Sequence, residues 1–498
     1  MKVENLLVNK RRTAYNRKKG ILSLLIIIVM IAPSISVQAE ISVDHEHPEM
    51  FWKNYPYHPP GTDIIFPTDE GSHDTNQFPI EWWYANFHLT GQTTGQEYGS
   101  FVAFYQIHST VVEKQEIRIF SISDIASEKI YSNAQIGTLT ASNDHLDLSF
   151  EYITNNNENT NLNCNEIVNT NSIPENQQIT MMTKYMDTTT KPMNLNNPMS
   201  ATQSDTIQKT TVIVNNNGGD EKSADELLQY DHWYTKTNGQ DLRPFQYTLV
   251  VGGDSQQDSK PMKLAVDMDC LKQPLIVGGN GVIDFGNYDF SYYYSFTRLI
   301  VTGTITVHGF TEEVLGNAWI DHQWGNFVNQ NPPPRGLKMT YEWFSIQLND
   351  NREIMVGDAW DRETGQKIDQ SYTGGLNLLN RDGSSELLKY YTITPQASWN
   401  DTTDHRFYSS KWHITETSKS IDLTVTPVFL YQVMRLKENY PLLQQFLEEL
   451  FPGACFWEGV CMVSGTINGI SVNGKSYAEL THSYDNGDNK NLIISEKN

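Results

Sequence analysis

One short segment of the chain gathers side chains that could carry acid–base chemistry. Residues 319–325 read Trp-Ile-Asp-His-Gln-Trp-Gly, so an imidazole, a carboxyl group and two indoles lie close together. Successive side chains of a strand point to opposite faces, which puts His322 and Trp324 on one face and Asp321 and Gln323 on the other. Inside a barrel, the imidazole and the indole could line a cavity. The alternative is that both Trp side chains pack in a core and Asp321 caps the turn at the Gly.

A second segment combines an acid with aromatic residues, because Glu81 is followed by Trp82, Trp83 and Tyr84. Alternation predicts Trp82 and Tyr84 on one face and Glu81 and Trp83 on the other. Burial among aromatic rings would raise the pKa of the Glu81 carboxyl, as a general acid requires. The alternative is a salt bridge at the rim of a barrel. Residues 456–459, Phe-Trp-Glu-Gly, repeat the combination.

Other motifs do not indicate function. Residues 469–476 match the P-loop pattern, but a P-loop needs a helix directly afterwards. The alternation over 477–484 is instead typical of a strand, and Asn473-Gly474 predicts a hairpin turn, so we expect no nucleotide site. No G-x-S-x-G motif and no zinc-like Cys/His spacing occurs, so we expect neither a serine hydrolase nor a metal site.

Most of the chain has the period-two pattern of strands, with aromatic and β-branched residues between Gly, Asn and Asp turns. This pattern predicts an antiparallel barrel or sandwich. The best candidate helix spans 428–451. Between about 154 and 220 Asn and Thr dominate without any period, which indicates a flexible insertion. We therefore predict two β domains, 56–298 with this insertion and 299–485.

The first 39 residues have the features of a secretory signal. A basic segment precedes an apolar run of about 12 residues, and small residues at Val37 and Ala39 offer a cleavage site. An uncleaved anchor, which would then be the only membrane contact, is the alternative. The net charge of −23 argues against nucleic acid as a partner. We expect a secreted or extracytoplasmic protein.

The cysteine count excludes a disulfide-stapled fold. Cys164, Cys270, Cys455 and Cys461 are too few to form a framework for 498 residues. Cys455 and Cys461 are also too far apart to pair along one straight strand.

Several of these segments occur together in one known family. The runs 81–84, 293–299, 316–325 and 456–459, the last followed by Gly465, resemble landmarks of the AttH-like family in the same order. That family includes carotenoid 1,2-hydratases (hydroxyneurosporene synthases) and kievitone hydratase. The resemblance implies an all-β fold of two tandem lipocalin-like barrels. It also implies cofactor-independent water addition or cyclisation on a lipophilic, terpenoid-like alkene.

The resemblance also suggests roles for individual residues. His322 and Trp324 match the family's His-x-Trp pair, and our candidate for the downstream acid is Asp358, with Glu342 beside Tyr341 as the second choice. The expected catalytic residues are His322, Trp324, Asp358, Asp321 and Glu81. The expected substrate-binding residues are Trp82, Tyr84, Tyr341, Trp343 and Trp457.

The chain departs from the family at one position of this motif. The usual Asp-His-Glu-Trp-Gly reads Asp-His-Gln-Trp-Gly, so Gln323 replaces a carboxylate by a neutral amide. Water addition is in doubt if that carboxylate carries the proton in relatives. The replacement is harmless if the side chain points outward, opposite His322, which is what alternation favours.

Three hypotheses for function remain open. The first is an exported hydratase, isomerase or cyclase that protonates a lipophilic alkene. The second is a carrier that binds an apolar ligand in the same cavity without chemistry. The third is an interaction protein whose contact arm is the segment 154–220.

Overall fold

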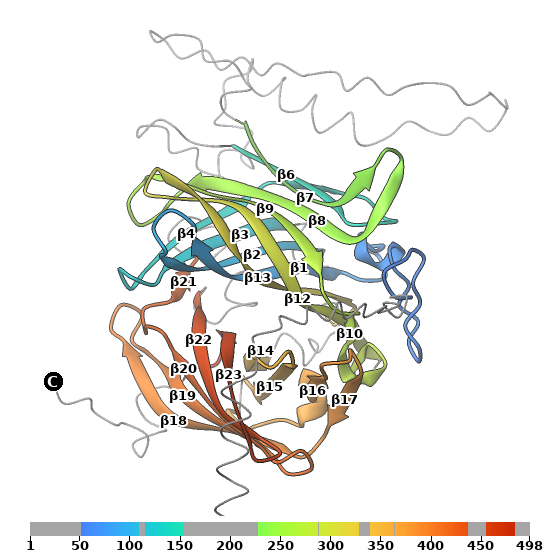
Figure 1. Cartoon of the computed structure of the whole chain (residues 1–498), viewed down its shortest axis with the longest axis vertical. Coiled ribbons are helices and arrows are strands. Elements are labelled where there is room, and N and C mark those ends of the chain that lie inside the picture. Colours follow the sequence, from blue (N-terminus) through green and yellow to red (C-terminus); the bar gives the residue numbers. More distant parts are fainter. Residues whose placement is uncertain are drawn as a thin grey trace, which may run out of the picture. The chain divides into compact units, whose positions relative to one another are not determined.

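The computed structural model describes residues 51–108, 115–153, 228–286, 288–327, 339–362, 364–436 and 455–483. The predicted signal segment, the predicted Asn/Thr-rich insertion and Cys164 lie outside these ranges. Two antiparallel sheets and three short 3₁₀ helices account for the regular structure of the described ranges (Figure 1). No helix within these ranges is long and apolar enough to cross a membrane.

The first sheet has the strand order β4-β3-β2-β1-β13-β12-β9-β8-β7-β6-β5, and β10 and β11 both pair with β12. It curves nearly into a barrel. Its strands are β1 (Ile80–Gly91), β2 (Glu97–Ile107), β3 (Gln115–Asp124), β4 (Lys129–Ile136), β5 (Thr138–Ala141), β6 (Asp147–Ile153), β7 (Leu228–Asn238), β8 (Asp241–Asp254), β9 (Pro261–Cys270), β10 (Leu275–Ile276), β11 (Val282–Gly286), β12 (Asp289–Val307) and β13 (Phe310–Gly325).

The second sheet has the order β17-β16-β15-β14-β23-β22-β20-β19-β18, and β21 pairs with β22. Its strands are β14 (Met339–Leu348), β15 (Glu353–Asp361), β16 (Leu376–Leu379), β17 (Ser385–Leu388), β18 (Tyr391–Asp401), β19 (Arg406–Glu416), β20 (Ile421–Pro427), β21 (Val433–Arg435), β22 (Cys455–Ile467) and β23 (Ile470–Leu480). The 3₁₀ helices are η1 (Thr68–Glu70), η3 (Val277–Gly279) and η5 (Gln370–Thr373).

The burial of each strand follows its sequence pattern. In β9 buried residues alternate with more exposed ones, because one face packs in the barrel and the other meets solvent. In β1 nearly every side chain is buried. Its Trp83 face packs in the interior of the first sheet, whereas its Tyr84 face packs in a second core together with residues of the second sheet, including Trp343 and Phe456. A third core fills the second sheet.

The predicted boundary at residues 298 and 299 falls inside strand β12. Both β12 and β13 belong to the first sheet, and the chain changes sheet between Gly325 and Met339. A register shift between Phe296 and Leu299 interrupts the pairing of β12 with β13. Because of this irregularity, the 19-residue strand consists of two alternating blocks. The sequence analysis placed the predicted domain boundary between these two blocks.

Three local predictions have clear outcomes. The strand after the P-loop-like segment is confirmed as part of β23, but the hairpin turn lies at Asn468-Gly469, both at positive φ, and Gly474 is inside the strand. The predicted helix is wrong over 428–436, where β21 forms, and its remainder, 437–451, lies outside the described residues. Cys455 and Cys461 are both buried on β22, with no disulfide bond between them, as the spacing predicted.

A buried ion cluster joins the two sheets. Glu353 on β15 is fully buried and accepts hydrogen bonds from Lys272 (2.7 Å) and from Arg298 of β12. Lys475 on β23 and Glu97 on β2 also connect the sheets, at 2.7 Å, but this pair is largely exposed. The two contacts therefore differ mainly in burial.

Replacing Glu353 by Ala leaves two cations in the contact between the sheets without their shared carboxylate. Removal of one member of a buried ion pair costs about 3–5 kcal/mol, so we expect Glu353→Ala to reduce the free energy of unfolding by that amount. The control Lys475→Ala removes the exposed pair and is expected to cost less than about 1 kcal/mol. Urea denaturation measures both, and equal losses would contradict the prediction.

Candidate functional site

A cavity of about 170 Å³ lies between the two sheets. A single buried water needs roughly 10–15 Å³ on this scale, so the space suits a small organic molecule. Its walls are formed by strands β1, β2, β11–β15 and β23 and by the helix η5. The aromatic side chains of the lining are Trp82, Tyr84, Tyr105, Phe285, Tyr293, Phe327, Tyr341, Trp343 and Tyr372.

Asp321 provides a carboxyl group to this cavity. It lies opposite Tyr84 on β1 and opposite Ser295 on β12, so three neighbouring strands place these side chains in one row. Its Oδ1 accepts hydrogen bonds from the Ser295 hydroxyl and from the Trp319 indole Nε1, the latter at 2.8 Å. Burial raises the pKa of Asp321 to about 7, because these bonds compensate only part of the lost solvation.

The second sheet provides two further carboxyl groups, of which Glu479 lines the cavity and Glu458 lies next to Glu479. Glu458 on β22 and Glu479 on β23 are directly opposite each other, and both are buried. The Tyr84 hydroxyl donates to Glu458 at 2.8 Å, and the Tyr341 hydroxyl donates to Glu479 at 2.7 Å. Burial raises the pKa of Glu479 to about 7, with a smaller contribution from the charge of Asp321. Burial, followed by the charge of Glu479, also raises the pKa of Glu458.

These carboxyl groups can exchange protons near neutral pH. A carboxyl with a pKa of about 7 is partly protonated there, so Asp321 and Glu479 can each donate or accept a proton. The surrounding aromatic faces attract cations, which favours a positively charged intermediate. The cavity therefore combines an acid, a base and cation stabilisation in a site that is largely apolar.

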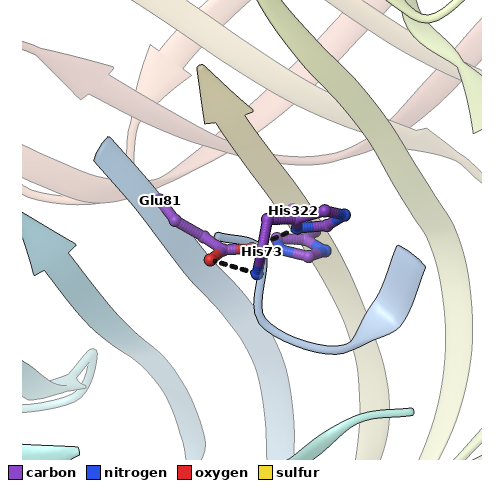
Figure 2. A group of neighbouring side chains, drawn as sticks. All are labelled: His73, Glu81 and His322. Atoms are coloured by element: carbon purple, nitrogen blue, oxygen red, sulfur yellow. Dashed lines mark hydrogen bonds and ion pairs between the residues drawn. The ribbon is translucent and has the colours of Figure 1, made fainter. Parts of the chain in front are cut away.

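The opposite faces of β1 and β13 carry a separate polar cluster (Figure 2). His73, which precedes β1, places Nδ1 2.6 Å from Oε1 of Glu81, and His322 places Nε2 2.9 Å from the same oxygen. The indole of Trp324 stacks on His73 at a ring distance of 4.0 Å, and Trp83 stacks on His322 at 4.8 Å. We call the three residues drawn in Figure 2 the His–Glu–His cluster.

The charges of this cluster balance internally. Burial lowers the pKa of His73, but hydrogen bonds with Asp69 and Glu81 outweigh it and bring the pKa to about 9. Burial raises the pKa of Glu81, but hydrogen bonds with His322 and His73 outweigh it and bring the pKa to about 2. Burial lowers the pKa of His322. In the absence of other ligands, His73 is thus the cation paired with the Glu81 carboxylate.

Comparison with known proteins identifies the family. Residues 199–484, more than half of the chain, match the AttH-like family model. The chain belongs to the AttH-like family. No curated protein matches the sequence.

Solved structures support the same fold. An AttH protein from Nitrosomonas europaea is 19% identical, with a TM-score of 0.53, and the match covers 85% of this chain and 98% of that one. Kievitone hydratase from Nectria haematococca is 12% identical, with a TM-score of 0.50, and the match covers 86% of this chain and 98% of that one. At these identities the likeness shows the fold alone. The AttH-like chain thus has the tandem lipocalin-like architecture predicted from its sequence.

The structure places the predicted site residues of this AttH-like chain in three groups. Glu81, His322 and Trp324 meet in the His–Glu–His cluster and its stacked ring. Asp321 and four of the five predicted binding residues line the cavity; these four are Trp82, Tyr84, Tyr341 and Trp343. The alternative in which Asp321 caps the turn at Gly325 is wrong, since its carboxylate binds Ser295 and Trp319.

The remaining two predicted residues point into the second sheet. Asp358 binds Lys367 and Gln370, and its neighbours Gly357 and Ala359 line the cavity instead. Trp457 packs in the core of the second sheet and donates to the Leu430 carbonyl. Alternation along β15 and β22 turns both side chains away from the cavity, so the structure does not bring Asp358 to His322.

The second-choice acid also serves the second sheet. The Glu342 carboxylate accepts hydrogen bonds from the Ser409 hydroxyl at 2.5 Å and from the Trp412 indole at 2.9 Å. Burial raises the pKa of Glu342 to about 7. Its carboxylate is therefore engaged with the core side of β14, although the residue borders the cavity.

Gln323 is opposite His322 as predicted, but this face of β13 is not an outer surface. Gln323 lines the cavity, and its amide donates to the Ser291 hydroxyl at 2.7 Å. The expectation that it points outward is wrong because the second sheet covers this face. The amide that replaces the family's carboxylate is thus a neutral part of the cavity wall, and Asp321 is the acid that β13 contributes to the lining.

Sequence reasoning missed Glu479 and His73. Glu479 lies in the alternating segment after the P-loop-like motif. Nothing in its spacing to other acids along the sequence indicates that it belongs to a site. His73 lies before β1, where no strand pattern assigns it a face. Only the pairing of distant segments brings these residues to Tyr341 and Glu81.

Replacing Asp321 by Asn should change how stability depends on pH. Because burial raises the pKa of Asp321 from about 4 to about 7, the native state binds more protons than the unfolded state in this window. The free energy of unfolding of the wild type therefore falls as the pH rises through this window. Asp321→Asn removes the contribution of Asp321 to this fall, which is on the order of 1 kcal/mol or more. Denaturation at pH 5, 6, 7 and 8 measures the slope.

The matched control is Glu313→Gln, which removes an exposed carboxyl from the same strand. It should keep the wild-type slope. A wild-type slope in Asp321→Asn as well would show that Asp321 titrates normally in the folded chain.

Proposed function

We propose that this AttH-like protein is a cofactor-independent enzyme of the hydratase or cyclase type that protonates an alkene of a lipophilic small molecule. The observation that supports this most directly is the pair of carboxyl groups with pKa values of about 7, Asp321 and Glu479, in one aromatic cavity. Such groups hold and release protons at neutral pH without a metal or organic cofactor.

The reaction uses one carboxyl as the acid and the other as the base. Neutral Asp321 transfers its proton to one alkene carbon, and the other carbon becomes a cation facing the rings of Trp82, Tyr105 and Trp343. Water then adds to the cation and gives a proton to the Glu479 carboxylate. Proton transfer back to Asp321 restores the starting state. In a cyclase, a second alkene of the substrate attacks the cation in place of water, and the new cation formed by ring closure loses a proton to the Glu479 carboxylate.

The lining of the cavity indicates the class of substrate. Most of its side chains are aromatic or aliphatic, and only a few polar groups stand among them. The proposed substrate is therefore mostly apolar.

A relative's name is consistent with this proposal. One protein that shares the fold is called a hydratase, and we extend that class of reaction to this chain. We also propose export, based on the signal-like segment 1–39 and the acidic composition. The carrier hypothesis uses the same cavity without proton transfer, and the variants below distinguish it.

The substrate class can be established by native mass spectrometry of the protein purified from its source, with identification of the released small molecules. An unsaturated lipophile supports the enzyme. A saturated lipid supports the carrier.

With that compound, Asp321→Asn and Glu479→Gln should each lower turnover by about 10²- to 10⁴-fold, the usual contribution of a general acid or base. Both substitutions keep side-chain size, so we expect ligand affinity to change little. Activity of the wild type should fall above pH 7, because Asp321 then loses the proton that it must donate.

Glu313→Gln again provides the control and should keep full activity. Unchanged turnover in both cavity variants would reject the proposed chemistry. Absence of turnover in the wild type, with tight binding in all variants, would establish a carrier.

A further inference from the structure

The His–Glu–His cluster has the donor set of a transition-metal site. Two imidazole nitrogens, Nδ1 of His73 and Nε2 of His322, both face Oε1 of Glu81, at 2.6 and 2.9 Å. The three candidate ligand atoms lie within 4.8 Å of one another. Two His and one carboxylate are the ligands of many catalytic zinc and non-haem iron sites.

The outer atoms of all three side chains are already held by other groups. Nδ1 of His322 lies 3.0 Å from the backbone oxygen of Asp69, and Nε2 of His73 lies 3.2 Å from the Asp69 carboxylate. The other oxygen of Glu81 accepts from the backbone N–H of His73 at 3.0 Å and from the Ser72 hydroxyl at 3.3 Å. Metal-binding His residues characteristically donate their second N–H to a carboxylate or a carbonyl in this way.

Hydrogen-bond geometry leaves the inner atoms of the cluster facing each other. The backbone oxygen of Asp69 can only accept a hydrogen bond from Nδ1 of His322, whereas the Tyr294 hydroxyl, 3.1 Å from the same nitrogen, can donate one. With the N–H at Nε2, His322 donates to the Glu81 carboxylate; with the N–H at Nδ1, Nε2 presents a lone pair to that carboxylate at 2.9 Å, and these two acceptors need a proton or a cation between them. A bound metal ion selects the second arrangement.

We propose that His73, Glu81 and His322 bind one divalent transition-metal ion, with Zn²⁺ as the reference ion. The stacked rings of Trp324 and Trp83 fix the planes of the two imidazoles. The bound ion replaces the proton between His73 and Glu81 and links the segment before β1 to strands β1 and β13. This proposal is independent of the cavity chemistry, which uses the opposite faces of the same strands.

Access to the site is from the His73 side. The side chains of Glu81 and His322 are 1% exposed, whereas those of His73 and Asp69 are 15% and 21% exposed. Three protein ligands leave one position of tetrahedral zinc for water. We expect this fourth ligand to enter beside His73.

The test measures Zn²⁺ and Co²⁺ binding by the full chain. His45 and His47, which are close in the sequence, are other possible ligands, so all variants carry His45→Asn and His47→Asn. We expect one bound ion per chain by calorimetry and by elemental analysis. With Co²⁺ we expect the visible absorption of a tetrahedral site. Zn²⁺ should also raise the melting temperature, because it binds the folded state.

Four substitutions assign the site. Glu81→Gln and His322→Asn should abolish binding, and so should His73→Asn, whose partly exposed position makes it the variant least expected to disturb folding. Asp69→Asn should weaken binding about 10- to 100-fold, the usual effect of losing a group that orients a ligand. The control His232→Asn removes a His from a half-exposed pair with Asp147 and should leave binding unchanged.

No saturable binding by the background protein would overturn the proposal. Binding that survives His73→Asn would also overturn it. In either case the cluster is a proton-sharing hydrogen-bond network. Neither result affects the tests of Asp321 and Glu479.

Discussion

Strand β1 and the second half of β13, residues 318–325, are buried on both faces, and this double burial determines where both candidate sites lie. One face of the pair fills the interior of the first sheet, and the other packs in a core shared with the second sheet. A strand pair in this position has no solvent-facing side on which to leave polar groups. Each acid or imidazole on it must therefore find a buried partner or change its pKa.

The two faces solve this problem differently. On the interior face, hydrogen bonds with His322 and His73, together with the charge of His73 at 2.6 Å, outweigh burial and keep Glu81 ionised. On the face toward the second sheet, Asp321 is hydrogen-bonded only by neutral groups, and its pKa rises to about 7. Adjacent residues of one strand can thus serve an ion-binding cluster and a proton-exchanging cavity without interfering with each other.

The second sheet contributes acids as well as a covering surface. Glu458 and Glu479 are directly opposite on neighbouring strands, an arrangement that would be unfavourable if both were ionised. Tyr84 and Tyr341 donate to these carboxylates, and the charge of Asp321 acts on both from the first sheet. The contact that includes Glu353, Lys272 and Arg298 joins the same two sheets, so the proton-exchanging groups of the cavity depend on how the sheets pack.

Local pattern and family likeness determined a large part of this protein. Alternation alone assigned His322 and Trp324 to one face of β13 and Asp321 and Gln323 to the other, and ordered motifs predicted the AttH-like fold. These inferences succeed because a strand's side-chain period is a property of its backbone. Only the tertiary structure decided what each face meets: the cavity at Asp321 and Gln323, the core around Trp457, and the approach of His73 to Glu81. These contacts depend on pairing between distant segments, for which alternation carries no information.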